Sequence, residues 1–212
     1  MGKETKILIS DDHLTIRTGL KHILSSALSP VSFDEATTGA ETLKKLSMGN
    51  WGLVILDINM PSKDGLEVLG EIQDNYPKTR VLVLSMYTED QFSVRCIKAG
   101  AYGYLSKTAD DQQIIEAVQT ILNGRKYISP EVAELLSIEL VHGHTGPPHE
   151  SLSDREFQTF LKIAVGKSVT KVADELNLSV STVNTYRSRV LKKMNAKSNA
   201  DLIRYAIDHE LI

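Results

Sequence analysis

Short apolar segments alternate with amphipathic segments along the first part of the chain. The apolar segments predict strands over residues 6–10, 31–36, 53–57, 81–85 and 101–105. Between them, apolar positions recur with helical spacing and predict helices over residues 15–28, 40–48, 64–76, 90–99 and 110–122. Residues 53–56 are apolar throughout, as is typical of a strand covered by helices on both faces. The alternation predicts an α/β fold with a doubly wound, five-stranded parallel sheet.

After Tyr127 the alternation stops. Residues 130–140 predict a short helix. Residues 141–150 hold two Gly, two Pro and three His without periodicity, which is typical of a linker. From residue 151 on, apolar spacing predicts an all-α region with four helices, over residues 153–165, 169–176, 180–194 and 198–209.

Local signals mark the ends of these C-terminal helices. Ser153 and Glu156 form a capping-box pattern, Gly166 is expected to end the first helix, and Ser198 to cap the last. A short helix, a tight turn at residues 177–179 and a longer helix predict a helix-turn-helix. We therefore expect domains over residues 1–127 and 151–212, joined by a linker over residues 128–150.

Charge is unevenly distributed in a chain whose formal net charge is −3. Residues 1–150 hold 14 Lys and Arg against 20 Asp and Glu, whereas residues 151–212 hold 10 against 7. A basic rear part suggests that the second domain meets a polyanion. The longest apolar run, residues 53–56, is too short to cross a membrane, and the first residues lack the apolar core of a secretory signal. We expect a cytoplasmic protein without a membrane partner.

The single cysteine and the histidines of the linker each allow two interpretations. Cys96 is the one cysteine of the chain, so no internal disulfide forms, which suits a reducing compartment. A small buried side chain is its simpler interpretation, and a reactive thiol is the alternative. The three His of the linker are a candidate metal site, but they stand in a Gly- and Pro-rich loop without Cys or acidic partners.

Polar side chains follow the predicted strands. Asp11 and Asp12 come after the first strand, Asp57 ends the third, and the fourth and fifth lead to Ser85 and Lys107. Because the carboxyl ends of parallel strands meet at one edge of a sheet, these side chains are expected to converge. Carboxylates packed together repel each other unless a cation is present, and Mg²⁺ prefers oxygen ligands. Helix capping is the alternative for the first two carboxylates, but it does not account for the others.

These residues, together with the run over residues 57–65, resemble the receiver domain of two-component response regulators over residues 4–125. The resemblance implies that Asp57 accepts a phosphoryl group from the phosphohistidine of a sensor histidine kinase, or from acetyl phosphate. It implies a Mg²⁺ ion held by Asp12, Asp57 and the backbone carbonyl of Asn59, with Asp11 acting through water. Neutralising the charge of the transferring group is what the chemistry needs.

The same resemblance assigns supporting roles. Lys107 would pair with the phosphoryl oxygens, and Ser85 would hydrogen-bond to them and leave space for the ring of Tyr104 to turn inward. A half-buried strand residue is the alternative interpretation of Tyr104. Pro61 and Gly65 would shape the loop beside the acceptor, with glycine meeting unusual dihedral angles. Met86 stands where many receivers carry a smaller residue, and we hypothesise that it slows dephosphorylation.

The third C-terminal helix has an apolar and a polar side. Its core positions are expected at Val183, Tyr186, Val190 and Met194. Arg and Lys neutralise phosphates, Arg also reads guanine, and Asn can pair with adenine. We therefore expect DNA contacts from Thr182, Asn184, Thr185, Arg187, Ser188, Arg189, Lys192 and Lys193. A solvated basic face is the alternative.

The C-terminal segment resembles the LuxR/FixJ-type DNA-binding domain. The matching residues lie at 152–156, 164–166, 172–173, 176–179, 182–183 and 193–194. A receiver, a linker and this domain in this order are typical of the NarL/FixJ class of response regulators.

The resemblance implies a phosphorylation-activated transcription regulator, not an enzyme beyond its own phosphorylation and slow dephosphorylation. The expected partners are a sensor histidine kinase, double-stranded promoter DNA and a second copy of the chain when phosphorylated, with RNA polymerase as a further candidate. A phosphohydrolase is the first rival, but Asn59 stands where such enzymes commonly carry an acid–base carboxylate. A receiver controlled by protein contact without phosphate is the second.

Overall fold

The computed structural model describes residues 4–60, 65–86, 89–142 and 147–212. The chain forms two compact units, Met1–Ser137 and Ile138–Ile212. The boundary between them falls within helix α6 (Pro130–His142), inside the segment that the sequence predicts as a linker. The domain limits given above remain predictions, and each unit is described by itself.

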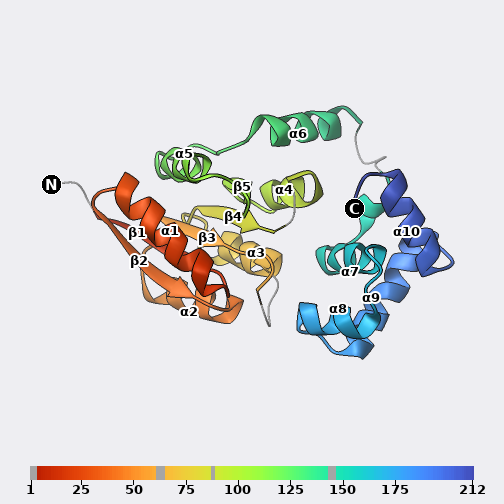
Figure 1. Ribbon diagram of the computed structural model, residues 1–212. Helices are drawn as coiled ribbons and strands as arrows, with labels where there is room; N and C mark the ends of the chain where they lie inside the picture. Colours follow the sequence, from red (N-terminus) through yellow and green to blue (C-terminus); the bar gives the residue numbers. More distant parts are fainter. Residues whose placement is uncertain (1–3, 61–64, 87–88, 143–146) are drawn as a thin grey trace. The chain divides into compact units, whose positions relative to one another are not determined.

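The first unit is an α/β sheet with helices on both faces (Figure 1). Its strands are β1 (Thr5–Ser10), β2 (Val31–Ala36), β3 (Leu53–Leu56), β4 (Val81–Ser85) and β5 (Gly103–Ser106). Its helices are α1 (Leu14–Ala27), α2 (Gly39–Met48), α3 (Gly65–Asn75), α4 (Glu89–Lys98) and α5 (Asp111–Leu122). All strand pairs are parallel, in the order β2-β1-β3-β4-β5. The predicted α/β fold class is confirmed.

Alternate residues of the central strands belong to two apolar layers, one on each face of the sheet. Ile7 and Ile9 of β1 pack with Leu53 and Ile55 of β3 against α1 and α5. Residues between these positions, such as Val54, are also buried and face the opposite side because side chains alternate along a strand. Burial on both faces explains why the strands read as apolar runs.

Three strands differ from their predicted bounds, and the first of them, β1, begins at Thr5 instead of residue 6. β3 ends at Leu56, so Asp57 follows the strand instead of ending it. β5 begins at Gly103 and not at residue 101, because the backbone N–H of Ala101 donates to the carbonyl of Cys96 at the end of α4 (2.9 Å). These differences arise from hydrogen bonding at strand ends, which apolar content does not report. Cys96 is buried, as its simpler interpretation requires.

The second unit is helical. After the 3₁₀ helix η1 (Pro148–Ser151) come α7 (Asp154–Ala164), α8 (Val169–Leu176), α9 (Val180–Lys193) and α10 (Asn199–Asp208). Each of the four α-helices has serine at its N-cap, at positions 153, 168, 179 and 198. Gly166, with φ of 82°, follows α7, and Asn177 in the left-handed conformation separates α8 from α9. The predicted helix-turn-helix is therefore present as α8, a tight turn and α9.

The packing of this unit matches the predicted periodicity of α9 in part. Val183, Val190 and Met194 are buried, whereas Tyr186 is only partly buried. Helix α6 extends to His142 and not to residue 140 as predicted, and η1 begins at Pro148. Within the described ranges, no helix of either unit is both long enough and apolar enough to cross a membrane.

Candidate functional site

Asp57 lies at the carboxyl end of β3, next to β1. Its backbone N–H donates to the carbonyl of Ser10 (2.8 Å), which fixes the start of the loop against the neighbouring strand. Its side chain is buried, and Oδ1 accepts the backbone N–H of Asn59 (2.9 Å). β1 and β3 are the strands where the order of the sheet reverses, and such a switch point is the place where open α/β sheets bind ligands.

Lys107 contacts residues at the ends of three other strands. Its Nζ lies 2.7 Å from Oδ2 of Asp57 and 2.6 Å from Oδ2 of Asp11, and all three side chains are almost fully buried. Its backbone N–H donates to the carbonyl of Ser85 (2.6 Å). Residues from the ends of β1, β3, β4 and β5 therefore meet at one edge of the sheet, as the sequence predicts.

The charges of this cluster are coupled. Burial raises the pKa of Asp57, and the nearby Asp11 carboxylate acts in the same direction, while Lys107 partly offsets both. Burial disfavours the charge of Lys107, but Asp57 and Asp11 outweigh it and raise the pKa of that ammonium. The site therefore keeps a cation next to a carboxylate that is poorly solvated.

Three carboxylates and one imidazole lie close enough to share a metal ion. One ligand atom from each of Asp11, Asp12, His13 and Asp57 lies within 4.8 Å of all the others. Carboxylate oxygens are the donors that Mg²⁺ prefers, so the donor set fits that ion. Neither aspartate is the N-cap of α1, a position that His13 occupies, so the capping alternative does not describe them.

Two nearby residues were not identified from the sequence. His13 directly follows the aspartate pair, and this position in the sequence could have identified it as a residue of the site. Arg17 of α1 is buried, donates from Nη1 to the carbonyl of Asp11 (2.8 Å) and donates from Nε to Glu35 of β2 (2.7 Å). One feature of the sequence indicated this role, namely that a charged residue stands among the apolar core positions of α1. Arg17 ties the acidic loop to the first helix and the edge strand.

The other predicted site residues are near the ends of β3, β4 and β5 in the sequence. Ser85 and Tyr104 are buried, so the half-buried interpretation of Tyr104 is wrong, whereas Met86 is exposed. Pro61 lies outside the described residues. Gly65 is required by space and not, as expected, by unusual dihedral angles, because an added Cβ would lie 2.3 Å from Cα of Ile58.

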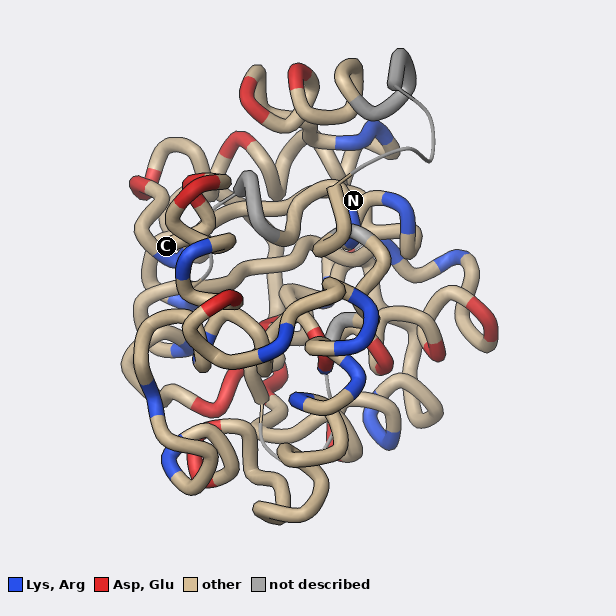
Figure 2. Tube along the Cα trace, turned by 90° about the vertical axis from the view of Figure 1, so that its right-hand side faces the viewer, with Lys and Arg blue, Asp and Glu red and all other residues tan. Residues whose placement is uncertain are grey.

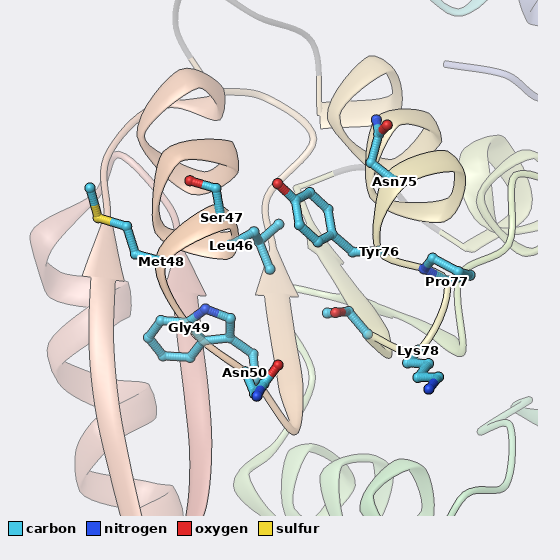
Figure 3. Close-up of a pocket in the computed structure, with 11 residues that line it drawn as sticks. Leu46, Ser47, Met48, Gly49, Asn50, Asn75, Tyr76, Pro77 and Lys78 are labelled. Atoms are coloured by element: carbon cyan, nitrogen blue, oxygen red, sulfur yellow. The ribbon is translucent and has the colours of Figure 1, made fainter.

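A surface pocket of about 630 Å³ lies elsewhere in the first unit (Figure 3). It is lined by the ends of α2 and α3 and the segments that lead into β3 and β4, with Trp51, Tyr76 and Lys78 among its residues. The ring of Tyr76 extends toward Leu46 and Ser47 of α2 (Figure 3). These segments precede the strands, whereas Asp57 follows one. The pocket is therefore separate from the acidic cluster.

The polar side of α9 is the candidate nucleic-acid surface. Figure 2 marks the Lys and Arg positions along the chain, and both signs of charge occur in the second unit. Of the predicted contact residues, the exposed ones are Asn184, Thr185, Ser188, Arg189, Lys192 and Lys193. Thr182 is partly buried in the first turn, where its backbone N–H donates to Oγ of Ser179 (3.0 Å).

Two of the predicted contact residues bind within their own unit. Nε of Arg187 donates to Oδ1 of Asn199 at the start of α10 (2.7 Å). Nζ of Lys193 donates to Oε2 of the buried Glu156 (2.6 Å) and to the carbonyl of Ser151 (3.2 Å). These two side chains brace α9 against its neighbours, which the helical pattern alone did not indicate.

Comparison with known proteins agrees with both units. Residues 7–119 match the response regulator receiver domain, and residues 150–206 match the bacterial regulatory proteins of the luxR family. The response regulator UvrY of Escherichia coli (strain K12) is 32% identical over 206 residues, which cover 97% of this chain and 94% of UvrY. The oxygen regulatory protein NreC of Staphylococcus carnosus is 33% identical, covering 98% of this chain and 99% of NreC.

Solved structures support the fold. A structure of the RcsB response regulator from Salmonella typhimurium has a TM-score of 0.70 at 20% identity, covering 96% of this chain and 97% of that one. RcsB from Salmonella enterica serovar Typhimurium bound to promoter rprA with phosphomimetic BeF₃⁻ has a TM-score of 0.66 at 20% identity, covering 96% and 98%. The chain belongs to the response regulators of two-component systems, and its receiver and LuxR-type DNA-binding domains make it a phosphorylation-dependent transcription regulator of the NarL/FixJ class.

Proposed function

We propose that Asp57 accepts the phosphoryl group of a sensor histidine kinase, and that the modified chain dimerises on promoter DNA. The observation that carries the proposal is the buried contact between Asp57 and Lys107, 2.7 Å apart, with Asp11 on the same ammonium. In the transfer, a carboxylate oxygen of Asp57 forms a bond to phosphorus while the bond from phosphorus to the kinase imidazole breaks. The imidazole leaves with the electron pair.

Lys107 supplies the charge that this transfer requires. The incoming group carries several negative oxygens into a region that already holds two buried carboxylates, so a fixed cation lowers the barrier. Asp12, Asp57 and the backbone carbonyl of Asn59 would hold Mg²⁺, with Asp11 acting through water. The ion, when bound, supplies further neutralisation of the phosphoryl oxygens.

Ser85 and Tyr104 would carry the signal away from the phosphate. A new group of charge about −1.5 to −2 on Asp57 would attract the Ser85 hydroxyl and change the packing around the buried Tyr104 ring. The resulting change of surface would favour the dimer, as expected of a regulator that reads a two-fold symmetric site. RNA polymerase is a further candidate partner once the dimer is on DNA.

The output surface would be the exposed side of α9. Arg189 and Lys192 would meet phosphates or base edges in the major groove, while Asn184 and Thr185 lie nearer the start of the helix. RcsB, which is similar in fold, has been solved on promoter DNA. That likeness supports the proposal that this chain binds promoter DNA.

The proposal is tested by labelling the full-length chain with acetyl phosphate and Mg²⁺. Asp57→Asn should abolish labelling, and Asp74→Asn, which changes an exposed carboxylate on α3, should leave it intact. DNA affinity measured before and after labelling should rise in the wild-type chain and not in Asp57→Asn. Labelling that persists in Asp57→Asn would refute the acceptor assignment, and rapid release of many phosphates per chain would favour a phosphohydrolase.

A further inference from the structure

His13 holds a position in the acidic loop that the mechanism above does not use. It follows Asp12 and is the N-cap residue of α1, yet its side chain makes no capping hydrogen bond. The ring is therefore not used to begin the helix. Its backbone N–H instead donates to Oδ1 of Asp11 (2.8 Å), which fixes the main chain of His13 beside the carboxylate.

The imidazole faces the carboxylates. Nδ1 lies 2.7 Å from Oδ1 of Asp12 and 3.2 Å from Oδ1 of Asp11, and one ligand atom of Asp57 completes a group of four within 4.8 Å. Lys107 contacts the other oxygen, Oδ2, of Asp11 and of Asp57. Oδ1 of Asp11, Oδ1 of Asp12 and Nδ1 of His13 thus lie together on an edge of the cluster that Lys107 does not contact.

This edge mixes hard and intermediate donors. Carboxylate oxygens suit Mg²⁺, whereas a neutral imidazole suits Co²⁺, Ni²⁺ and Zn²⁺, whose affinity for nitrogen follows the order of the first-row metals. The His13 side chain is 62% exposed, so a tautomer with its proton on Nε2 can keep that nitrogen in water while Nδ1 offers its lone pair to an ion.

We propose that His13 is a side-chain ligand of the receiver's cation site and makes it bind transition-metal ions, with Co²⁺ as the probe, more tightly than carboxylates alone would. The inference rests on the proposed cation site of the receiver. It adds a consequence that carboxylates do not have: the site distinguishes between Mg²⁺ and a nitrogen-seeking ion through one residue.

The test is a metal titration of the full-length chain by calorimetry, together with the visible absorption of bound Co²⁺. Because the chain has 6 His, the signal counted is the Co²⁺ that excess Mg²⁺ displaces. His13→Asn should weaken that Co²⁺ binding by about tenfold or more and change its absorption spectrum, with Mg²⁺ affinity altered by less than about twofold. His22→Asn, an exposed histidine further along α1, is the matched control and should change neither.

Each other outcome contradicts the proposal in a recognisable way. Unchanged Co²⁺ affinity and spectrum in His13→Asn would show that His13 is not a ligand, with the carboxylate site left intact. Equal loss of Co²⁺ and Mg²⁺ would make His13 a residue that positions Asp11 and Asp12 and no nitrogen ligand. If wild-type protein binds neither ion, or binds Co²⁺ that Mg²⁺ does not displace, the proposed cation site itself is absent.

Discussion

Nζ of Lys107 lies 2.7 Å from Oδ2 of Asp57, and both side chains are almost fully withdrawn from solvent. Since the same ammonium also contacts Asp11, one cation balances two buried carboxylates that are fifty and ninety-six positions away in the chain. The packing of the sheet and the proposed phosphoryl transfer therefore depend on the same atoms.

Replacement of Lys107 by alanine should destabilise the receiver. It leaves two buried carboxylates without their cation, which costs about 3 kcal/mol in the free energy of unfolding, and Mg²⁺ should recover part of the loss. Urea unfolding followed by the fluorescence of Trp51, the one tryptophan of the chain, measures both effects. Lys78→Ala, at an exposed lysine, is the control, and equal losses in the two variants would contradict the argument.

Gly65 should tolerate no side chain. A Cβ at this position would lie 2.3 Å from Cα of Ile58 and 2.5 Å from the carbonyl oxygen of Asp57, so Gly65→Ala must displace the backbone that holds the proposed acceptor. We expect a loss of about 2 kcal/mol in unfolding free energy and slower labelling by acetyl phosphate. Gly70→Ala on the same helix meets nothing within 4 Å and should be neutral or stabilising. Similar stability of the two variants would refute the steric account.

Lys192 and Lys193 should differ although they are neighbours. Lys192→Ala should lower DNA affinity for all sequences and flatten its salt dependence by about one unit of slope. Lys193→Ala should mainly cost stability, about 1 kcal/mol, because it removes the partner of the buried Glu156. Fluorescence anisotropy with labelled duplex and thermal unfolding separate the two effects. A reduced salt slope in Lys193→Ala at unchanged stability would reverse the assignment.

Glu175 should make the second unit sensitive to acid. Hydrogen bonds from Lys162 and Lys167 lower the pKa of its carboxyl from 4.5 to about 2. A lowered pKa means that the stabilisation is present above pH 4.5 and is lost as pH falls toward 2. Glu175→Gln should therefore cost about 1 kcal/mol at pH 7, after allowance for solvent screening, and almost nothing near pH 2.

Amide hydrogen exchange of α8 in the full-length chain measures this difference at each pH. Asp174→Asn, which alters the exposed neighbour of Glu175, should show little change at any pH. A pH-independent effect of Glu175→Gln would mean that the ion pairs do not account for its stabilisation.

Met86 should slow the loss of phosphate. It directly follows Ser85 at the end of β4 and is 64% exposed, so we expect its side chain to hinder the approach of water to the strand ends. Met86→Ala should speed phosphate release about threefold or more, since access of water to the acyl phosphate then improves. Release from labelled protein is timed beside Met48→Ala, an exposed methionine of α2. An unchanged or slower rate in Met86→Ala would end this hypothesis.

Much of the fold could be predicted because its signals are local. The apolar runs at β2 and β4 gave both strand limits correctly, and the serine caps, Gly166 and the helical spacing located α7 to α10 within about one residue. The strand ends also indicated that Asp57 and Lys107 lie together, because the carboxyl ends of parallel strands meet in any doubly wound sheet. The apolar pattern gave the wrong strand limits where hydrogen bonds to another element set them, as at the start of β5.

By itself the sequence determined which residue types stand at the strand ends and on α9. Only the tertiary structure decided which atoms meet: Lys107 with Asp11 as well as Asp57, Nδ1 of His13 with the aspartate pair, and Lys193 with Glu156. Periodicity places a side chain on a face, but its partner depends on strand register, helix placement and rotamer, which are set by contacts between distant segments. The place of Asp57 at the edge of the sheet was therefore predictable from the sequence, and the residues that balance its charge were only partly so.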